Sequence, residues 1–358
     1  MSASSRVVLE IKDAVKAFGG VQALSGADLV LYEGEIHALL GENGAGKSTL
    51  LKSLAGVHRI DSGSITLNGN SFQQGSTRTA QQQGVAVIYQ EPSLFPDLTL
   101  AENVFVGRHL QTAKMVDWSK MQLEAKTLFD QLGVDLDVNR IARGLSIADQ
   151  QIVEIVKALS IKAQVIVMDE PTAALSSKEV ERLFSVARTL QDQNCAVVFV
   201  SHRLDEVFAL CQRMTVMRDG ATVGSDEITN VSEAQIIKMM VGREVSELFP
   251  KQPPKLGDVV LKVENLCSSG QFAGINFEVR KGEIFGLAGL VGSGRSEIVR
   301  AIFGVDQYDT GSVSVHGVSL PKGSASKAMA AGIALVPEDR RQQGLLMPYS
   351  IAKNTSIT

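Results

Sequence analysis

Ile36-His37-Ala38-Leu39-Leu40-Gly41-Glu42-Asn43-Gly44-Ala45-Gly46-Lys47-Ser48 is the stretch that decides the fold, because a mainly apolar run leads directly into a glycine-rich loop. Residues 41–48 fit the pattern GxxxxGKS, and residues 48–55 continue with the apolar spacing of a helix. A strand, a glycine loop and a helix in this order are the context that a phosphate-binding loop requires. We call residues 41–48 the phosphate loop and predict that it binds a nucleoside triphosphate.

The composition limits the other possibilities. The chain has 358 residues, of which 44% are apolar, and a net charge of -4. This length allows two domains, and the charge argues against a broad nucleic-acid footprint. Cys195, Cys211 and Cys267 lie far apart, which is typical of small buried residues in a reducing compartment. The sequence contains no run of 18 apolar residues and no apolar N-terminal segment, so we expect neither a membrane span nor a signal peptide.

Short apolar segments predict an α/β fold. Residues 7–12 and 27–32 alternate between apolar and polar, as half-buried strands do. Continuous apolar runs at 85–89, 164–168 and 196–200 are typical of a buried parallel sheet. Residues 100–160 are expected to be mostly helical, with apolar helix faces at 121–132 and 149–159.

The pattern then repeats. A proline-rich segment at 249–254 interrupts helical structure, and from Gly34 onwards the first half recurs at a constant offset of 248 residues. We therefore predict a tandem duplication, with a first domain at 7–243, a linker at 244–258 and a second domain at 259–358. The matched residues include Gly34 with Gly282, Gly41 with Gly289, Gly46 with Gly294, Lys47 with Arg295, Ser48 with Ser296, Asp61 with Asp309, Gly63 with Gly311, Gly69 with Gly317, Gly84 with Gly332 and Gln90 with Glu338.

The phosphate loop has an assignable chemistry. Its glycines let backbone N–H groups close around phosphate oxygens, and the following helix contributes its positive dipole end. Lys47 is expected to reach the β- and γ-phosphates, and the Ser48 hydroxyl to ligate Mg²⁺. The residues expected to hold the triphosphate are Gly41, Glu42, Asn43, Gly44, Ala45, Gly46, Lys47, Ser48 and Thr49.

Two further strand ends carry candidate catalytic groups. The apolar residues 165–168 are followed by Asp169 and Glu170, which places both acids where ligands bind in open α/β sheets. Asp169 suits Mg²⁺, and Glu170 suits a general base that polarises the attacking water. His202 follows the apolar run 196–200 and is positioned to contact the γ-phosphate. Each pattern alone is equally compatible with an ordinary strand end, but the phosphate loop upstream favours the functional interpretation.

Taken together, these residues resemble the nucleotide-binding domain of an ATP-binding cassette (ABC) transporter. The resemblance implies a P-loop core, an antiparallel β subdomain and a helical subdomain, tandemly duplicated, with ATP and Mg²⁺ as cofactors. Gln90 resembles the family's Q-loop glutamine, a catalytic residue and Mg²⁺ ligand, and Phe18 resembles the aromatic residue that stacks on adenine. For Phe18 the alternative is a core phenylalanine. The family's signature segment is expected at Leu145, Ser146, Ile147, Ala148 and Asp149.

The tandem layout narrows the resemblance. The second loop, Gly289 to Ser296, and the later run Pro337-Glu338-Asp339-Arg340-Arg341 are similar to the fused ATPases of bacterial monosaccharide and autoinducer-2 importers. This implies an ATP-hydrolysing subunit on the cytoplasmic face of the inner membrane. Its partners would be permease subunits, a periplasmic solute-binding protein and a second cassette or ATPase copy, with no nucleic acid. Leu94 and Phe95 are expected to line the permease groove or, alternatively, the core of the helical subdomain.

Several positions depart from the family pattern. In the signature segment, Ile147 hinders close backbone approach to a phosphate and Asp149 adds an unfavourable charge. In the second loop, Arg295 does not replace lysine geometrically, and Glu338 replaces the Q-loop glutamine. The family's cassettes face head to tail, so both defects would fall in one composite site. We therefore expect one degenerate and one hydrolytic site.

The offset also predicts an incomplete second domain. Thr358 corresponds to Leu110, so counterparts of Ser146, Asp169, Glu170 and His202 are not in this sequence. A truncated gene, a split gene and a fragment trimmed for expression all fit. Two other functions remain open: a remnant that binds ATP without transport, and a soluble cassette ATPase. The short, nearly uncharged linker and the lack of a long coiled-coil insertion argue against the soluble ATPase. The transported solute cannot be read from this chain.

Overall fold

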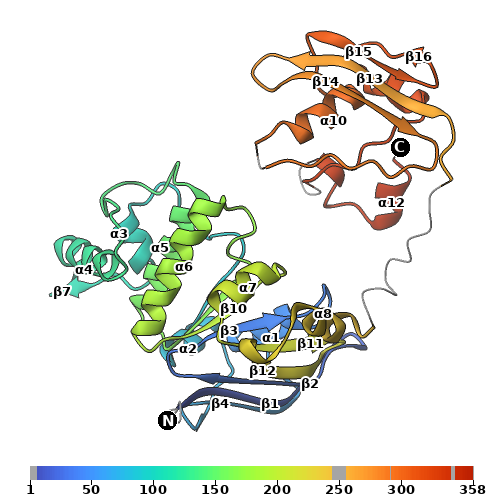
Figure 1. Ribbon diagram of the computed structural model, residues 1–358. Helices are drawn as coiled ribbons and strands as arrows, with labels where there is room; N and C mark the ends of the chain where they lie inside the picture. The colour runs from blue at the N-terminus through green and yellow to red at the C-terminus, as the bar shows by residue number, and fades with distance from the viewer. Residues whose placement is uncertain (1–5, 244–254, 291, 340–342, 358) are drawn as a thin grey trace. The chain divides into compact units, whose positions relative to one another are not determined.

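The computed structural model describes residues 6–243, 255–290, 292–339 and 343–357. The chain divides into two compact units, Met1–Pro250 and Lys251–Thr358, and each is described by itself (Figure 1). The prolines of the expected linker, Val291 of the second loop and residues 340–341 lie outside the described residues. No helix in the described ranges is long and apolar enough to cross a membrane.

The first unit begins with an antiparallel sheet. Its strand order is β2-β1-β4-β5, and the strands are β1 (Val7–Phe18), β2 (Val21–Tyr32), β4 (Ser62–Leu67) and β5 (Asn70–Ser71). The predicted alternation is confirmed, because Leu9, Ile11, Leu29 and Leu31 are all buried. These side chains form one core with α1 (Lys47–Leu54) and one face of the central sheet.

The central sheet positions the candidate site. Its six strands have the order β12-β11-β3-β10-β9-β6, and all neighbouring pairs are parallel except β11 with β12. The carboxyl ends of β3, β9 and β10 therefore meet at one edge, where the phosphate loop also begins. The strands are β3 (Ile36–Leu40), β6 (Val85–Ile88), β9 (Val165–Asp169), β10 (Ala196–Val200), β11 (Arg213–Arg218) and β12 (Ala221–Glu227).

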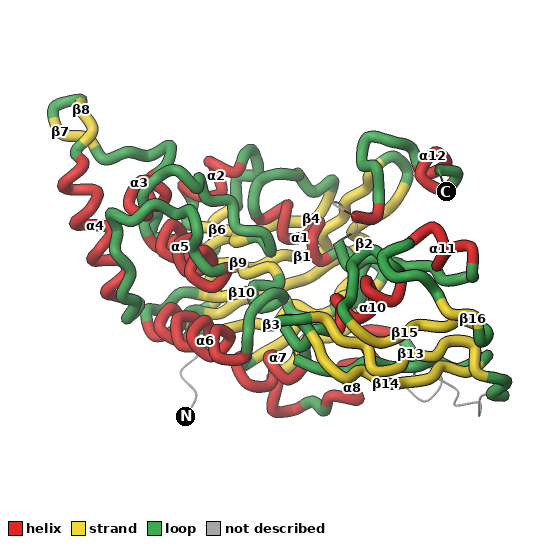
Figure 2. Tube along the Cα trace, turned by 90° about the horizontal axis from the view of Figure 1, so that it is seen from above, coloured by secondary structure: helices red, strands yellow, loops and turns green. Residues whose placement is uncertain are grey.

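Helices complete the first unit. The apolar faces of α3, α4 and α5 pack together as a helical subdomain around Val104, Phe129 and Ile152 (Figure 1). The bounds are α2 (Thr77–Gln82), α3 (Leu100–Phe105), α4 (Trp118–Gln131), α5 (Ile147–Leu159), α6 (Ser177–Asp192), α7 (Leu204–Leu210), η1 (Ile228–Asn230) and α8 (Glu233–Val241). One expectation needs correction, because the stretch before α4 is not helical but forms a hairpin of β7 (Gln111–Thr112) and β8 (Met115–Val116), which projects beyond α4 in Figure 2.

The second unit repeats the antiparallel sheet. Its strand order β14-β13-β15-β16 matches that of the first unit, and its small core centres on Val263, Leu266 and Ile298. The elements are β13 (Val259–Ser268), β14 (Phe272–Arg280), α10 (Arg295–Phe303), β15 (Thr310–Val315), β16 (Val318–Ser319), α11 (Ala325–Ala330) and α12 (Ile351–Thr355).

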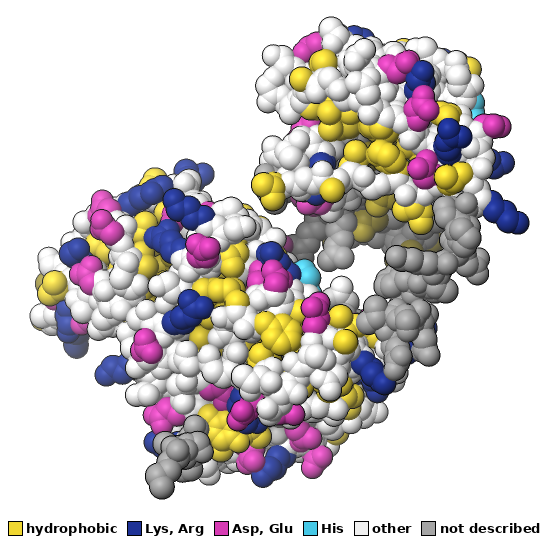
Figure 3. All heavy atoms as spheres, in the orientation of Figure 1, with side chains coloured by type: hydrophobic (Ala, Val, Ile, Leu, Met, Phe, Trp, Pro, Cys, Tyr) yellow, Lys and Arg dark blue, Asp and Glu magenta, His cyan; other side chains and the backbone are white. Residues whose placement is uncertain are grey.

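Two apolar runs of the second unit have no strand partners among the described residues. Residues 284–288 and 333–336 correspond to β3 and β6, but neither is in a strand. In the first unit β3 pairs with β10 and β11, and β6 pairs with β9, which bury these runs. Here Ile284 is 100% and Val336 92% exposed. Figure 3 shows a band of hydrophobic side chains on the visible face of this unit.

Candidate functional site

The phosphate loop has the backbone that its glycines permit. Gly41 and Gly46 both have positive φ, at 149° and 98°. A Cβ on Gly41 would lie 2.4 Å from Met217 O, and one on Gly46 would lie 2.7 Å from Ala23 O. Because both neighbours are backbone atoms, the loop can pass this close to β2 and β11 only with glycine at these positions.

Lys47 begins α1 and folds back over the loop. Its Nζ donates hydrogen bonds to Gly41 O at 2.6 Å and Glu42 O at 3.0 Å. Burial lowers the pKa of the Lys47 ammonium below its ordinary value of 10.5, whereas the carboxylates of Glu170 and Asp169 act to raise it. The lysine therefore lies at the centre of the loop with two acids close by.

Those acids end β9, as the sequence predicts. Burial raises the pKa of Asp169 above its ordinary value of 3.8, the charge of Glu170 raises it further, and Lys47 opposes the rise. Glu170 has a φ of 47°, which is uncommon for a residue with a side chain, and its N–H donates to Val200 O at 3.0 Å. Backbone strain of this kind persists only where the surroundings hold it, and it is concentrated at functional sites.

Gln90 and His202 meet at Glu170. Gln90 Nε2 donates to Glu170 Oε2 at 3.4 Å, and His202 Nδ1 lies 3.5 Å from Glu170 Oε1. These residues come from the ends of three different strands, β6, β9 and β10, so the sheet brings together groups that are far apart in the sequence. Their arrangement suits a water molecule that must be polarised beside the phosphate loop.

Phe18 is not a core residue. Its ring is 41% exposed at the end of β1, makes an edge contact with His58 at 5.0 Å and lies 5.3 Å from Lys16 Nζ. Lys16 in turn pairs with Asp61, which also accepts the N–H of Ala17 at 2.8 Å. The turn that carries the aromatic face is thus fixed while the face itself stays accessible.

The signature segment lies at the start of α5, and its charge is balanced. Ser146 caps the helix by accepting the N–H of Asp149 at 3.1 Å, and its hydroxyl donates to Asp149 Oδ2 at 2.9 Å. Arg182 of α6 places Nη1 2.7 Å from Asp149 Oδ1. The negative charge that the sequence places at Asp149 is therefore paired with Arg182. No motif singles out Arg182, because it meets Asp149 only through the packing of α5 against α6.

The second unit differs at the position of Phe18. Tyr32 and Arg280 are 248 residues apart, but their strand partners Val7 and Val259 are 252 apart, so the β13–β14 hairpin is four residues shorter. The constant offset therefore does not extend to the first strand. Asp309 accepts the N–H of Ser269 as Asp61 accepts that of Ala17, which makes Gly270 the counterpart of Phe18.

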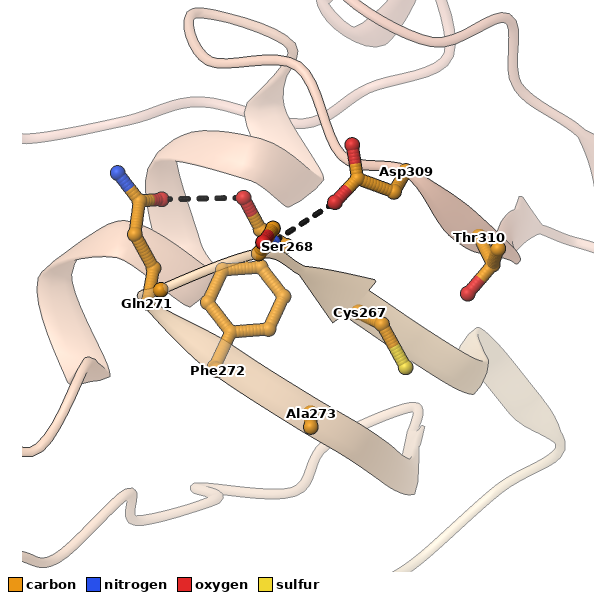
Figure 4. A pocket seen from close by; sticks show the side chains of 9 residues that line it. Cys267, Ser268, Gln271, Phe272, Ala273, Asp309 and Thr310 are labelled. Carbon is orange, nitrogen blue, oxygen red and sulfur yellow. Dashed lines mark hydrogen bonds between the residues drawn. The ribbon is translucent and has the colours of Figure 1, made fainter.

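The pocket at this turn has a volume of about 530 Å³ and is shown in Figure 4. Its only aromatic lining residue, Phe272, is a buried core residue that corresponds to Leu24. Arg295 begins α10 in the place of Lys47, after Gly294, whose Cβ would meet Gln271 O at 2.9 Å. The second loop thus keeps the positive φ of the first at Gly292 and Gly294 but not at Gly289, the counterpart of Gly41. It also has no exposed aromatic side chain at the turn.

A groove lies beside the residues that follow β6. It has a volume of about 630 Å³ and is lined by charged and apolar side chains, among them Arg78, Tyr89, Arg108, Glu154 and Lys157. Leu94 packs against the core of the first unit, whereas Phe95 is half exposed. Neither lines the groove itself.

The fold and this grouping of a phosphate loop, two acids, a glutamine and a histidine define a P-loop nucleotide hydrolase. The model of the ABC transporter family matches residues 24–173 and 272–354. The chain therefore belongs to the ABC transporter family, and it is an ATPase of the sugar-importer type, as the sequence predicts.

The relatives agree with this placement. The ribose import ATP-binding protein RbsA of Rhodococcus jostii is 56% identical over 98% of this chain and 70% of its own length. The proteins of the same name from Streptomyces avermitilis and Bacillus subtilis are 53% and 43% identical over 98% of this chain. A solved nucleotide-free ATP-binding cassette of an ABC transporter, 24% identical, covers 66% of this chain and all of its own with a TM-score of 0.59, which supports the fold.

Proposed function

We propose that this chain is the ATP-hydrolysing subunit of a ribose importer, that residues 7–243 form its complete cassette, and that residues 259–358 form a partial one. The observation that carries the proposal is the meeting of Lys47, Asp169, Glu170, Gln90 and His202 at the carboxyl edge of the central sheet. The relatives, which are up to 56% identical to this chain, are named as ribose import proteins.

The residues of the first unit divide the work of hydrolysis. Lys47 exchanges its two loop carbonyls for the β- and γ-phosphates, to which its ammonium gives charge-assisted hydrogen bonds. Glu170 accepts the proton of the attacking water, and His202, 3.5 Å away, contacts the γ-phosphate. The exposed face of Phe18 stacks on adenine, because a base can reach it without displacing the Lys16–Asp61 pair.

Mg²⁺ fits the donor set of this edge. No cluster of three or more metal-binding side chains occurs in the part of the chain that the structure describes. Mg²⁺ does not need one, since it binds through one or two carboxylates together with substrate phosphates and waters. Asp169, Ser48 and Gln90 are the oxygen donors that we assign to it. When bound, the ion neutralises phosphate charge and so favours phosphoryl transfer.

The first unit needs a signature segment from another cassette. In the family, each ATP lies between one phosphate loop and the signature of the facing cassette. Asp149 is held by both Ser146 and Arg182, so the signature segment of this chain presents a balanced charge to a phosphate. The β-branched Ile147 still hinders close approach, which keeps this signature the weaker partner.

The groove beside β6 is the site that we assign to a permease helix. Its lining combines apolar residues with three basic side chains, Arg78, Arg108 and Lys157, and two acidic ones, Glu91 and Glu154, which suits an amphipathic helix with charged side chains of both signs. Docking there would hold the chain on the cytoplasmic face of the inner membrane. It would also connect the permease to Gln90, which lies two residues before Pro92 in the lining of the groove.

The test separates binding from turnover. Glu170→Gln keeps the side-chain shape but removes the proton acceptor, so we expect ATP affinity to stay within about twofold while hydrolysis falls about 10²–10⁴-fold. Glu181→Gln, on an exposed face of α6, is the matched control and should behave as wild type. Wild-type turnover by Glu170→Gln would contradict the assigned base. Stimulation of the assembled transporter by galactose and not by ribose would contradict the solute.

A further inference from the structure

A buried carboxylate lies beneath the candidate site. Glu206 on α7 is only 3% exposed. Its Oε2 accepts hydrogen bonds from Thr172 Oγ1 at 2.6 Å and Ser201 Oγ at 3.0 Å. Its Oε1 faces Arg203, whose Nη1 lies 2.7 Å away as an ion pair. One side chain thus contacts three others that come from two separate segments.

These two segments are the ones that carry the catalytic groups. Thr172 lies two residues after Glu170, and Ser201 and Arg203 lie on either side of His202. Ser201 also accepts the N–H of Arg203 at 3.0 Å, which closes the loop around the histidine. Since Thr172 and Ser201 are themselves buried, the connection is shielded from water and is stronger for it.

The side chains of the catalytic groups lack such fixation. The side chain of His202 is 64% exposed, and its contact with Glu170 is a 3.5 Å approach, longer than a normal hydrogen bond. The backbone of Glu170 is strained, so its surroundings must hold it in place. Their relative position is therefore set by the backbone segments on which they stand. The bond from Glu170 N–H to Val200 O joins these segments at the end of the sheet, and Glu206 joins them a second time through Thr172 and Ser201.

A buried carboxylate at position 206 would be energetically unfavourable if its only role were to stabilise the core. Burying a charge loses its hydration, and apolar residues of similar volume often stabilise as well or better. The first turn of α7 offsets part of that cost, because a helix N-terminus favours negative charge. The two hydroxyl donors and Arg203 offset more, but they do so by tying down the loops on either side of the site.

We propose that Glu206 is a positioning residue for ATP hydrolysis, which sets His202 against Glu170 by fixing the loop 201–203 to the turn that begins at Thr172. The proposal rests on the proposed roles of Glu170 and His202. It does not make Glu206 a contact of the nucleotide. Its effect is transmitted through Thr172 and Ser201. A change at Glu206 therefore shifts the position of His202 and so lowers turnover, while it leaves the phosphate loop intact.

The variant Glu206→Gln tests this, because it keeps the shape while it removes the charge opposite Arg203. We expect the single-turnover rate of ATP hydrolysis to fall about 10- to 100-fold, as for a misplaced catalytic group, with ATP affinity within about twofold. Thr172→Val leaves Glu206 in place and should give a smaller loss in the same direction. Glu102→Gln is the matched control for the loss of a carboxylate from the first turn of a short helix, since Glu102 stands in the first turn of α3.

A second readout does not depend on turnover. The chain has five histidines, so the Cε1–H signal of His202 can be assigned with His202→Ala. Glu206→Gln and Thr172→Val should move that signal, while Glu102→Gln should not. In the His202→Ala background, Glu206→Gln should lower the rate no further. If hydrolysis survives both Glu170→Gln and His202→Ala, the proposed roles of these two residues are wrong, and the His202 signal still tests the geometry. A His202 signal unmoved by Glu206→Gln, with a rate no lower than that of Glu102→Gln, would overturn the proposal.

Discussion

Two glycines of the phosphate loop provide a matched pair of perturbations. Gly44 and Gly46 have nearly equal positive φ values, 87° and 98°. A Cβ on Gly44 meets nothing within 4 Å, whereas one on Gly46 lies 2.7 Å from Ala23 O and 3.2 Å from Gly220 Cα. Alanine at either position costs about 1–2 kcal/mol for its left-handed backbone. At Gly46 the backbone of β2 must also move, which adds about 1–3 kcal/mol.

We therefore expect Gly46→Ala to destabilise the first unit by about 2–5 kcal/mol and Gly44→Ala by about 1–2 kcal/mol. The single tryptophan, Trp118 in α4, reports urea unfolding of this unit by its fluorescence. With a slope of about 2 kcal/mol per molar urea, the two midpoints should differ by about 1 M. Equal midpoints would show that the loop relaxes freely around a Cβ, and the argument from close approach to Ala23 would be wrong.

Three further predictions concern charge, stacking and turnover. Burial and the charge of Glu170 raise the pKa of Asp169, so at a pH above its ordinary pKa the ionised carboxylate destabilises the nucleotide-free protein. Asp169→Asn should therefore raise Tm at pH 7. This increase in Tm should shrink as the pH falls towards about 4, where Asp169 becomes protonated. An unchanged Tm across that range would contradict the cause given for the shift. Phe18→Ala should weaken ATP binding by about 1–3 kcal/mol without affecting tripolyphosphate, and isothermal titration distinguishes the two ligands. The 358-residue chain alone should bind ATP and hydrolyse it very slowly, so fast steady-state turnover that is lost on Ser146→Arg would mean that the signature segment is competent.

The sequence predicts β3, β6, β9 and β10 of the central sheet because each is a short apolar run, whereas β11 and β12 are not among the strands it predicts. The runs predicted at 36–40, 164–168 and 196–200 become the buried parallel strands β3, β9 and β10. The hairpin 111–116 could not be found in this way. Its strands are two residues long, and its turn residues Ala113 and Lys114 have positive φ without glycine, so no local signal marks it.

The residues of the candidate site likewise fall into those that local sequence predicts and those that it does not. The phosphate loop, Asp169 and Glu170 follow strands directly, so motif and position predict them together. Arg182 and Glu206 carry no motif, and their partners lie 33 and 34 residues away in sequence. The correspondence of Gly270 with Phe18 could not be predicted, because the two hairpins differ in length by four residues and only the strand register reveals this difference. Contacts between segments that are distant in the sequence, and differences in strand register, are therefore the part that the sequence alone does not predict.

The central claim is that the first unit holds ATP through Lys47. The measurement is a Mg-ATP titration of wild type, Lys47→Ala and the exposed control Lys178→Ala, each checked for an intact fold. Lys47 offers charge-assisted hydrogen bonds of about 1.5–3 kcal/mol each, so losing two should raise Kd by about 10²–10⁴-fold. We predict one ATP site that Lys47→Ala abolishes and Lys178→Ala preserves, and equal binding by wild type and Lys47→Ala would contradict the account.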